Sequence, residues 1–270
     1  MSRQFTLRRG APRAAQLARS SLPVRSQARP LLAFTGGGIF FYWQLGAVLA
    51  LKQRVNLQAC DLSGASAGAL TAVLARCDVN LLSSVDLAYQ LAVDAGVYDS
   101  LSGLAFVWGD LIQSWLNELL PEDAHVRCSG SVELFTLALG LPPRHLPVSS
   151  FDSRPDLLAA CAASIHIPLF LNGRLTARFR GQRCVDSYLI APRDLVDTRK
   201  AARRAGEPGL SLLIDHNDDP SVAARRRAGD LLALVSRDGL DGMVTQGTKF
   251  MEGELASGRL DALLLAAPLE

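Results

Sequence analysis

The chain lacks acidic residues over its N-terminal part. Asp61 is the first carboxylate of the 270 residues, whereas residues 1–30 hold seven arginines and are rich in serine and alanine. This Arg-rich, Ser-rich and acid-free composition is typical of an organelle transit peptide. We therefore expect residues 1–30 to be a targeting leader, with the chloroplast preferred over the mitochondrion, or else a disordered basic arm. Because only Phe5 interleaves with the arginines, no nucleic-acid-binding tail is expected.

Cysteine and histidine are scarce as well. The five cysteines are scattered and odd in number, no pair has the spacing of metal ligands, and the His-Glu-x-x-His motif is absent. This excludes a disulfide framework and favours reduced thiols. The sequence predicts no metal and no cofactor. Only four histidines are available as catalytic bases: His125, His145, His166 and His216.

Charge is also absent from Leu31 to Leu51, a run long enough to suggest a membrane span. Three consecutive glycines, Gly36, Gly37 and Gly38, make such a helix unfavourable. We interpret the run as a buried strand over 31–34, a glycine-rich turn, and a helix from about residue 39 to residue 51. The sequence therefore predicts no integral membrane span.

The pentapeptide Gly64-Ala65-Ser66-Ala67-Gly68 has the Gly-x-Ser-x-Gly pattern of a nucleophile elbow. In this motif a strand turns sharply into a helix, and the serine occupies the strained corner. The flanks fit, with a short strand expected over 59–63 and helix-forming residues over 67–76. Gly64 and Gly68 would allow the close approach of strand and helix, and Ser66 is the candidate nucleophile.

The glycine-rich turn is the candidate oxyanion site. A dinucleotide fingerprint would need a glycine where Phe41 stands, and no Walker lysine follows. Backbone N–H groups of Gly37 and Gly38, together with Gly36, could instead stabilise the charge that develops during acyl transfer at Ser66. Both segments follow successive strands, whose carboxyl ends share one edge of a parallel sheet.

The sequence leaves two candidates for the base that activates Ser66. His216 follows a strand predicted over 210–215, late in the chain, as in a Ser-His-Asp triad. Asp186 follows a short strand over 181–185 and precedes a turn. The residue types and their spacing do not decide between them.

Over residues 31–195 the chain resembles the patatin-like phospholipases. Four blocks in the family's order carry the resemblance: the glycine loop Phe34-Thr35-Gly36-Gly37-Gly38-Ile39, the elbow around Ser66, Ala162-Ala163-Ser164-Ile165-His166-Ile167-Pro168, and Val185-Asp186-Ser187-Tyr188 followed by Pro192.

The resemblance implies a three-layer α/β/α hydrolase with a mainly parallel central sheet. It further implies a Ser66–Asp186 dyad that cleaves fatty-acyl esters through an acyl-enzyme, with Gly36, Gly37 and Gly38 binding the oxyanion. The substrate would be a lipid at a membrane or lipid-droplet surface. Two alternatives are a non-catalytic lipid-binding protein of the same fold and a triad esterase that uses His216.

Three residues depart from the family's pattern. Phe40 and Phe41 stand where the family has a basic residue and a glycine, and Ser187 replaces the glycine after the aspartate. These changes could alter the shape of the oxyanion loop and the direction in which Asp186 points.

One domain is expected over 31–270, with the motifs in 31–195 and a helical C-terminal part over 196–270. Residues 81–120 and 221–260 are also predicted to be helical. The helix that carries Trp108 and Trp115 has one apolar face, which we expect to face the core rather than a lipid interface. Basic clusters at 199–200, 203–204 and 225–227 are interpreted as solvated helix faces.

Overall fold

The computed structural model describes residues 29–190, 193–199, 210–224 and 230–269. Residues 1–28 of the predicted leader, Pro192 and nearly all of the three basic clusters lie outside this part, with Arg199 as the exception. The described strands are β1 (Leu31–Phe34), β2 (Asp61–Ala65), β3 (Val132–Ala138), β4 (Arg144–Val148), β5 (Ala177–Phe179), β6 (Gln182–Val185) and β7 (Ser211–Ile214).

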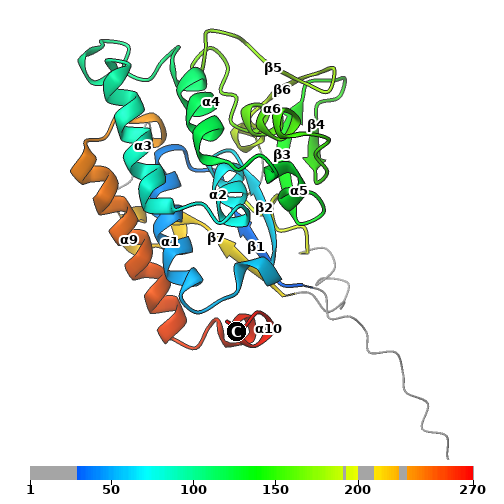
Figure 1. Cartoon of the computed structure of the whole chain (residues 1–270), viewed down its shortest axis with the longest axis vertical. Helices are drawn as coiled ribbons and strands as arrows, with labels where there is room; N and C mark the ends of the chain where they lie inside the picture. Colours follow the sequence, from blue (N-terminus) through cyan, green and yellow to red (C-terminus); the bar gives the residue numbers. More distant parts are fainter. Residues whose placement is uncertain (1–28, 191–192, 200–209, 225–229, 270) are drawn as a thin grey trace, which may run out of the picture.

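These strands form one seven-stranded sheet in the order β5-β6-β3-β2-β1-β7, with β4 paired to β3 (Figure 1). The strands β7, β1, β2 and β3 run parallel to their neighbours. The pairs β3–β4, β3–β6 and β5–β6 are antiparallel. The expected α/β class is confirmed, and the parallel half of the sheet carries the glycine loop and the elbow.

Strand β3 brings the ends of β2 and β6 together. β4 pairs along Leu134–Ala138 and so occupies one edge of β3. β2 pairs with residues 132–135 and β6 with residues 137–138, so both must use the other edge. Because β2 and β6 run in opposite directions along it, their carboxyl ends meet near Thr136.

The described helices are α1 (Phe41–Lys52), α2 (Ala67–Arg76), α3 (Leu81–Asp94), α4 (Trp108–Leu119), α5 (Ala124–Cys128), α6 (Arg154–Ser164), α8 (Pro220–Ala223), α9 (Arg237–Ala256) and α10 (Asp261–Ala266). Side-chain caps fix where several of them begin. Asn80 accepts a hydrogen bond from Ser83 N, Ser153 from Asp156 N, and Ser236 from Gly239 N.

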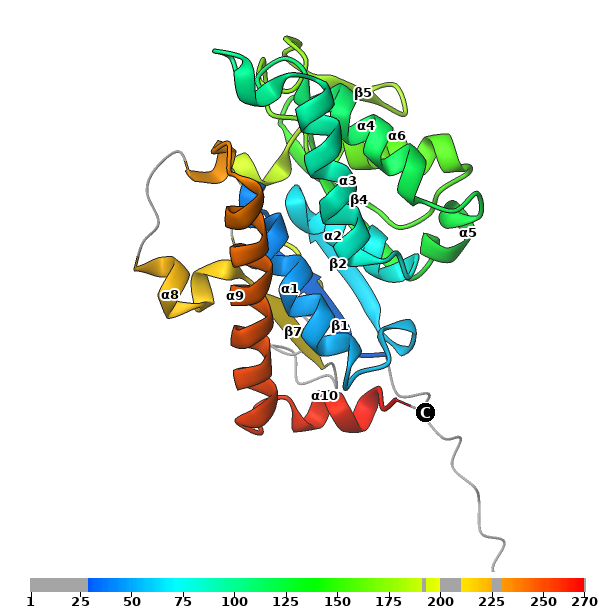
Figure 2. The same cartoon turned by 60° about the vertical axis from the view of Figure 1, so that its left-hand side comes forward.

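Helices α1 and α9 lie side by side, as both views show (Figures 1 and 2). Their backbones approach closely at two glycines. A Cβ on Gly46 would lie 2.0 Å from the Val244 carbonyl oxygen, and one on Gly247 would lie 1.9 Å from that of Trp43. This crossing fixes α9 against the helix that follows the glycine loop.

The two faces of the sheet are covered differently. Leu32 and Phe34 of β1 belong to the large apolar core shared with α1, α2 and α6. Leu31 and Ala33 point to the other face, where they form a smaller cluster with Phe135 and Val196. The alternation along one four-residue strand shows that β1 is buried on both faces.

The C-terminal part is less helical than expected. Strand β7 confirms the strand predicted over 210–215, but it interrupts the helical region predicted over 196–270. The helix expected over 221–260 is divided, since only α9 is long and residues 233–236 are not helical. The non-helical residues 233–236 contain no glycine and end at Ser236, which caps α9, whereas α9 continues through four glycines. The helices predicted over 81–120 are confirmed as α3 and α4.

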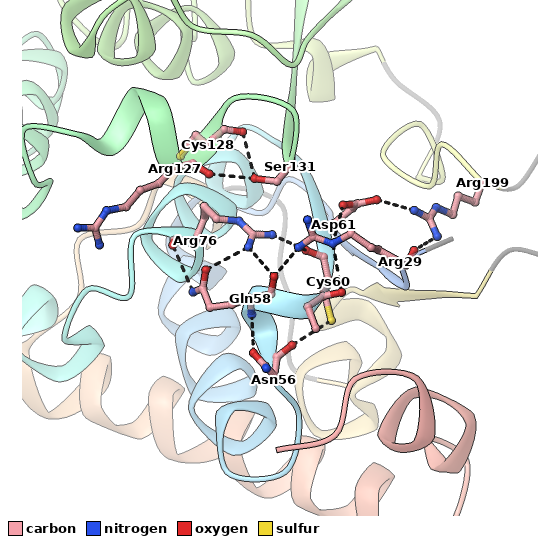
Figure 3. A network of polar contacts seen from close by, with 11 residues as sticks. Arg29, Asn56, Gln58, Cys60, Asp61, Arg76, Arg127, Cys128, Ser131 and Arg199 are labelled. Carbon is pink, nitrogen blue, oxygen red and sulfur yellow. Dashed lines mark hydrogen bonds and ion pairs between the residues drawn. The ribbon is translucent and has the colours of Figure 1, made fainter. Parts of the chain in front are cut away.

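A polar network lies at the amino end of β2, away from Ser66 (Figure 3). Arg76, at the end of α2, is buried and donates to Gln58 Oε1 at 3.1 Å and to the carbonyl of Cys60. Arg29 and Arg199 both pair with Asp61, at 3.3 and 2.6 Å. Pro30 also accepts from Asp61 N at 2.8 Å. Arg29 and Pro30 therefore contact the domain, although the sequence assigned both residues to the leader.

Candidate active site

Ser66 occupies the strained corner that its motif predicts. Its backbone angles are φ 55° and ψ −128°, directly between β2 and α2. A Cβ on Gly64 would lie 2.2 Å from the Gly68 carbonyl oxygen, and one on Gly68 would lie 2.2 Å from the Phe34 carbonyl oxygen. Both glycines are therefore required by close backbone approach, and the N-terminus of α2 points its positive dipole end toward the site.

Asp186 meets Ser66 across the gap between β2 and β6. The side chain is buried, and the Ser66 side chain lies close enough to its carboxylate to lower the pKa of Asp186. The carboxylate accepts from Tyr188 N at 2.8 Å, and Asp186 N donates to the His166 carbonyl oxygen at 2.8 Å. Burial raises the pKa of Asp186 to about 6, and Ser66 and the hydrogen bond from Tyr188 partly oppose this rise.

A second serine holds the elbow from behind. Ser164, at the end of α6, accepts a hydrogen bond from Ser66 N at 3.0 Å and donates to the Phe135 carbonyl oxygen at 2.7 Å. Thr136 donates to the carbonyl oxygens of Ala163 and Val185 at 2.9 and 3.0 Å. These bonds join α6, β3 and β6 around the dyad. The Ala-Ser-x-x-x-Pro block marked this segment in the sequence, but its positioning role is visible only in the fold.

The glycine loop lies beside the elbow. Gly37 has extended backbone, whereas Gly38 has φ 53° and a Cβ there would lie 2.0 Å from the Leu231 carbonyl oxygen. A Cβ on Gly36 would lie 2.3 Å from the Tyr188 ring. Within the described part of the chain, the N–H groups of Gly37 and Gly38 donate to no other residue. They are available to an oxyanion formed at Ser66.

Phe40, the first departure from the family's pattern, supports this loop. Its ring stacks on the imidazole of His216, which is fully buried. A Cβ on Gly37 would lie 3.0 Å from His216 Cε1 and 3.4 Å from Phe40 Cβ. The loop therefore rests on an aromatic pair where the family has a basic residue.

The other two departures also have places in the site. The Phe41 ring contacts the Trp115 ring edge-on at 5.6 Å and forms part of the cavity wall. Ser187 has no left-handed backbone, so the change from glycine imposes no strain, and its hydroxyl donates to the Phe135 carbonyl oxygen at 3.3 Å. Asp186 keeps its contact with Ser66 despite this replacement.

The histidines lie apart from the nucleophile. His216 stacks on Phe40 and lies against Gly37 of the glycine loop, whereas Asp186 is the residue whose pKa the Ser66 hydroxyl lowers. His166 is held by the Arg174 carbonyl oxygen at 3.2 Å, and burial lowers its pKa. His125 lies in α5 and His145 in β4. Of the two candidate bases, the structure therefore places Asp186, and not His216, next to Ser66.

An apolar cavity opens beside Ser66. It measures about 830 Å³, counting the space open to solvent. Its wall includes Trp108 and Trp115, so the apolar face of α4 points inward as expected. The remaining lining is almost entirely aliphatic or aromatic and comes from α1, α2, α3, α4 and the segments 165–170 and 231–233. A cavity of this chemistry accommodates a hydrocarbon chain.

Metal-binding clusters and membrane-spanning helices were both sought among the described residues. They contain no group of three or more His, Cys, Asp or Glu side chains placed to hold a metal ion. In the same part of the chain, no helix is both long enough and apolar enough to cross a membrane.

The elbow, the buried aspartate and the glycine loop lie together on an α/β fold, which is the arrangement expected of a serine acyl hydrolase. Residues 32–197 match the patatin-like phospholipase family, and the chain belongs to this family. The resemblance noted in the sequence is thus confirmed.

Relatives are similar over the same region. The chain is 31% identical over 159 residues to the 1-acylglycerol-3-phosphate O-acyltransferase Pnpla3 of Mus musculus, covering 57% of this chain and 38% of the relative. It is 26% identical over 164 residues to an omega-hydroxyceramide transacylase of Homo sapiens, covering 57% and 30%. It is 28% identical over 172 residues to patatin-like phospholipase domain-containing protein 4 of Homo sapiens, covering 58% and 64%. The chain spans less than two thirds of the length of each relative.

Proposed function

We propose that this domain cleaves fatty-acyl esters of lipids through an acyl-enzyme on Ser66, with Asp186 as the base. The observation that carries the proposal is the meeting of the ends of β2 and β6, which places the buried Asp186 carboxylate beside Ser66 at an apolar cavity. A serine in the wall of a hydrocarbon-sized cavity, with a carboxylate behind it, matches a substrate with an ester group at the end of an acyl chain.

In the first half-reaction, Ser66 Oγ attacks the ester carbonyl carbon as its proton passes to Asp186. The N–H groups of Gly37 and Gly38, with Gly36 completing the loop, stabilise the negative oxygen of the tetrahedral intermediate. Collapse of the intermediate breaks the ester C–O bond, and the leaving alcohol takes the proton from Asp186. The acyl group then remains on Ser66.

In the second half-reaction, Asp186 accepts a proton from water while the water oxygen attacks the acyl carbonyl. The tetrahedral intermediate collapses, Ser66 Oγ recovers the proton from Asp186, and the fatty acid is released. Asp186 suits both steps because burial raises its pKa to about 6, which brings a carboxylate closer to the range of an effective base at neutral pH.

Transfer of the acyl group to an alcohol is the second candidate. An acyl-enzyme can react with either acceptor, and two relatives carry the names O-acyltransferase and transacylase. The apolar lining of the cavity favours this candidate, since it offers water few polar partners. Product analysis with and without an added long-chain alcohol or lysolipid separates the two reactions.

Labelling with a fluorophosphonate probe tests the dyad directly. The full chain is compared with Ser66→Ala and Asp186→Asn, and with Ser102→Ala and Asp110→Asn as controls of matched chemistry outside the dyad. We expect labelling of the wild type and both controls, no labelling of Ser66→Ala, and strongly slowed labelling of Asp186→Asn. A folded wild-type protein that resists labelling but binds fatty acids would instead support the non-catalytic lipid-binding alternative.

The cellular setting is also a proposal. The composition of residues 1–30 supports import into an organelle, with the chloroplast preferred, and a lipid membrane or lipid droplet as the site of action. Fractionation of cells that express a fluorescent fusion tests the destination.

A further inference from the structure

The β5–β6 hairpin carries two arginines that face each other. Arg178 and Arg183 are direct cross-strand partners, so their side chains leave the sheet on the same face. Both are exposed, while their strand neighbours Phe179 and Cys184 point to the other face and are buried. Like charges directly opposite each other destabilise an antiparallel pair unless a counter-charge is supplied.

The chain supplies little counter-charge at this hairpin. No acidic residue occurs between Asp156 and Asp186 in the sequence, although the interval contains four arginines. Arg180 pairs with Asp156 at 2.5 Å. None of the ion pairs among described residues involves the other three, Arg174, Arg178 and Arg183.

A further exposed cation, on β4, lies on the opposite face of the sheet from Arg178 and Arg183, because it shares the face of Cys184. Arg144 of β4 is exposed and has the Gln182 side chain as a polar neighbour at 3.5 Å. It too has no ion-pair partner within the part of the chain that the structure describes. We call Arg174, Arg178 and Arg183, without Arg144, the arginine surface.

Large apolar side chains are exposed next to the arginine surface. Leu175 follows Arg174 and is 66% exposed, Leu169 is 52% exposed, and Phe106 is 59% exposed. Backbone hydrogen bonds join these segments: Leu169 N donates to Arg174 O at 2.8 Å, and Phe106 N donates to Phe170 O at 2.7 Å. Residues 101–108 contain no charge, and Asp110 is the first carboxylate beyond them.

The same segments lead to the cavity. Phe170 lies between Leu169 and Arg174 in the chain and lines the cavity, as do Leu104 and Trp108 on either side of Phe106. Both views place the β5–β6 hairpin and the α3–α4 connection at the end of the molecule away from α10 (Figures 1 and 2). Exposed cations, exposed apolar side chains and the wall of the cavity therefore share one end of the domain.

We propose that this end docks the domain onto a bilayer that contains anionic phospholipid. The arginine surface would contact the negative headgroups, while Phe106, Leu169 and Leu175 would enter the boundary of the hydrocarbon. This inference rests on the proposed function in that docking would present the cavity to lipid substrate. A bilayer fits better than a nucleic acid, because exposed aliphatic side chains gain from hydrocarbon and not from a phosphate backbone.

Vesicle co-sedimentation tests the surface. Full-length protein is mixed with phosphatidylcholine vesicles made with or without phosphatidylglycerol. The double variant Arg178→Gln/Arg183→Gln is compared with Arg54→Gln/Arg259→Gln, which removes the same charge from exposed arginines near α10. Because basic residues near an anionic surface each contribute about fivefold to partitioning, we expect a loss of roughly 10- to 30-fold for the hairpin variant. The control should bind as the wild type does.

Further measurements distinguish electrostatic attraction from hydrophobic insertion into the bilayer. They also distinguish membrane docking from catalysis. Leu175→Ser should weaken binding to both kinds of vesicle, and added salt should weaken binding to the anionic vesicles alone. Hydrolysis of a water-soluble short-chain ester should be unchanged in the hairpin variant. Failure of every protein to cleave that ester, with vesicle binding intact, would overturn the proposed function and leave the docking surface supported.

Two outcomes would overturn the docking proposal. One is equal binding of wild type, hairpin variant and control to the anionic vesicles. The other is wild-type protein that does not bind vesicles but binds single-stranded DNA through the same arginines. Circular dichroism of each variant confirms that a change in binding does not come from unfolding.

Discussion

The imidazole of His216 lies flat against the ring of Phe40, with ring centroids 4.3 Å apart and an interplanar angle of 8°. Gly37 packs against this pair, because a Cβ on that glycine would contact both residues. His216 therefore acts in this structure as a support of the glycine loop, a role distinct from that of a base.

Substitutions at His216 distinguish a residue that supports the glycine loop from a catalytic base. We expect His216→Phe to retain activity within several-fold, because phenylalanine preserves the stack but cannot accept a proton. His216→Ala should lower kcat by less than the roughly 10²–10³-fold cost of losing an oxyanion donor, since the loop loses its support and not its N–H groups. Steady-state kinetics on a soluble ester measures both. A triad would instead lose roughly 10⁴-fold or more with either variant.

The pH dependence of activity should report Asp186. Burial raises its pKa to about 6 from the ordinary value of 3.8, and the carboxylate must be ionised to accept the Ser66 proton. We expect kcat/KM to rise with pH through an apparent pKa near 6 and then to level off. The His216→Phe variant should keep the same profile. A profile whose acid limb disappears in that variant would assign the limb to His216.

The stability of Asp186→Asn should depend on pH. Since the folded-state pKa of Asp186 is raised, its stabilising contribution is present below the unfolded pKa of about 4 and is lost as pH rises through about 6. Two pKa units correspond to at most about 3 kcal/mol. Urea denaturation should show the variant about 1–3 kcal/mol more stable than wild type at about pH 8 and little changed near pH 4. Equal effects at the two pH values would contradict this account.

Two glycines of α9 should respond oppositely to alanine. Gly247→Ala places a Cβ against the Trp43 carbonyl oxygen and must separate α9 from α1, so we expect a loss of about 2 kcal/mol or more. Gly253→Ala meets nothing within 4 Å and should add up to about 1 kcal/mol through helix propensity. Thermal unfolding of the two variants measures the contrast. Similar shifts in both would show that the crossing is less tight than described.

Local sequence was sufficient for the elbow and the glycine loop. Gly64 and Gly68 are demanded by backbone contacts within a few residues of Ser66 or with the adjacent β1, and such requirements leave a readable pattern. The strand at 31–34 and the helix at 67–76 are likewise confirmed, because both are short, continuous and strongly apolar. The C-terminal region was harder to predict, since α9 continues through four glycines whereas the apolar residues before it, 233–235, are not helical.

Contacts over long separations were not visible in the sequence. The support of Gly37 by Phe40 and His216 joins residues on different elements, so Phe40 appeared only as a departure from a pattern. The opposed arginines of the hairpin also passed unnoticed, because their meaning depends on the β5–β6 register and on the lack of nearby acids. The basic clusters singled out from the sequence lie almost wholly outside the described residues.

The sequence by itself determined the elbow at Ser66, the glycine loop and the family, because these depend on backbone conformations that only particular short motifs adopt. Tertiary structure decided which candidate base lies beside Ser66. Asp186 and His216 each follow a strand, but β6 shares an edge of β3 with β2, whereas β7 pairs with β1. The pairing of strands thus brings Asp186 to Ser66 and leaves His216 beneath Gly37, since strand order alone sets which strand ends meet.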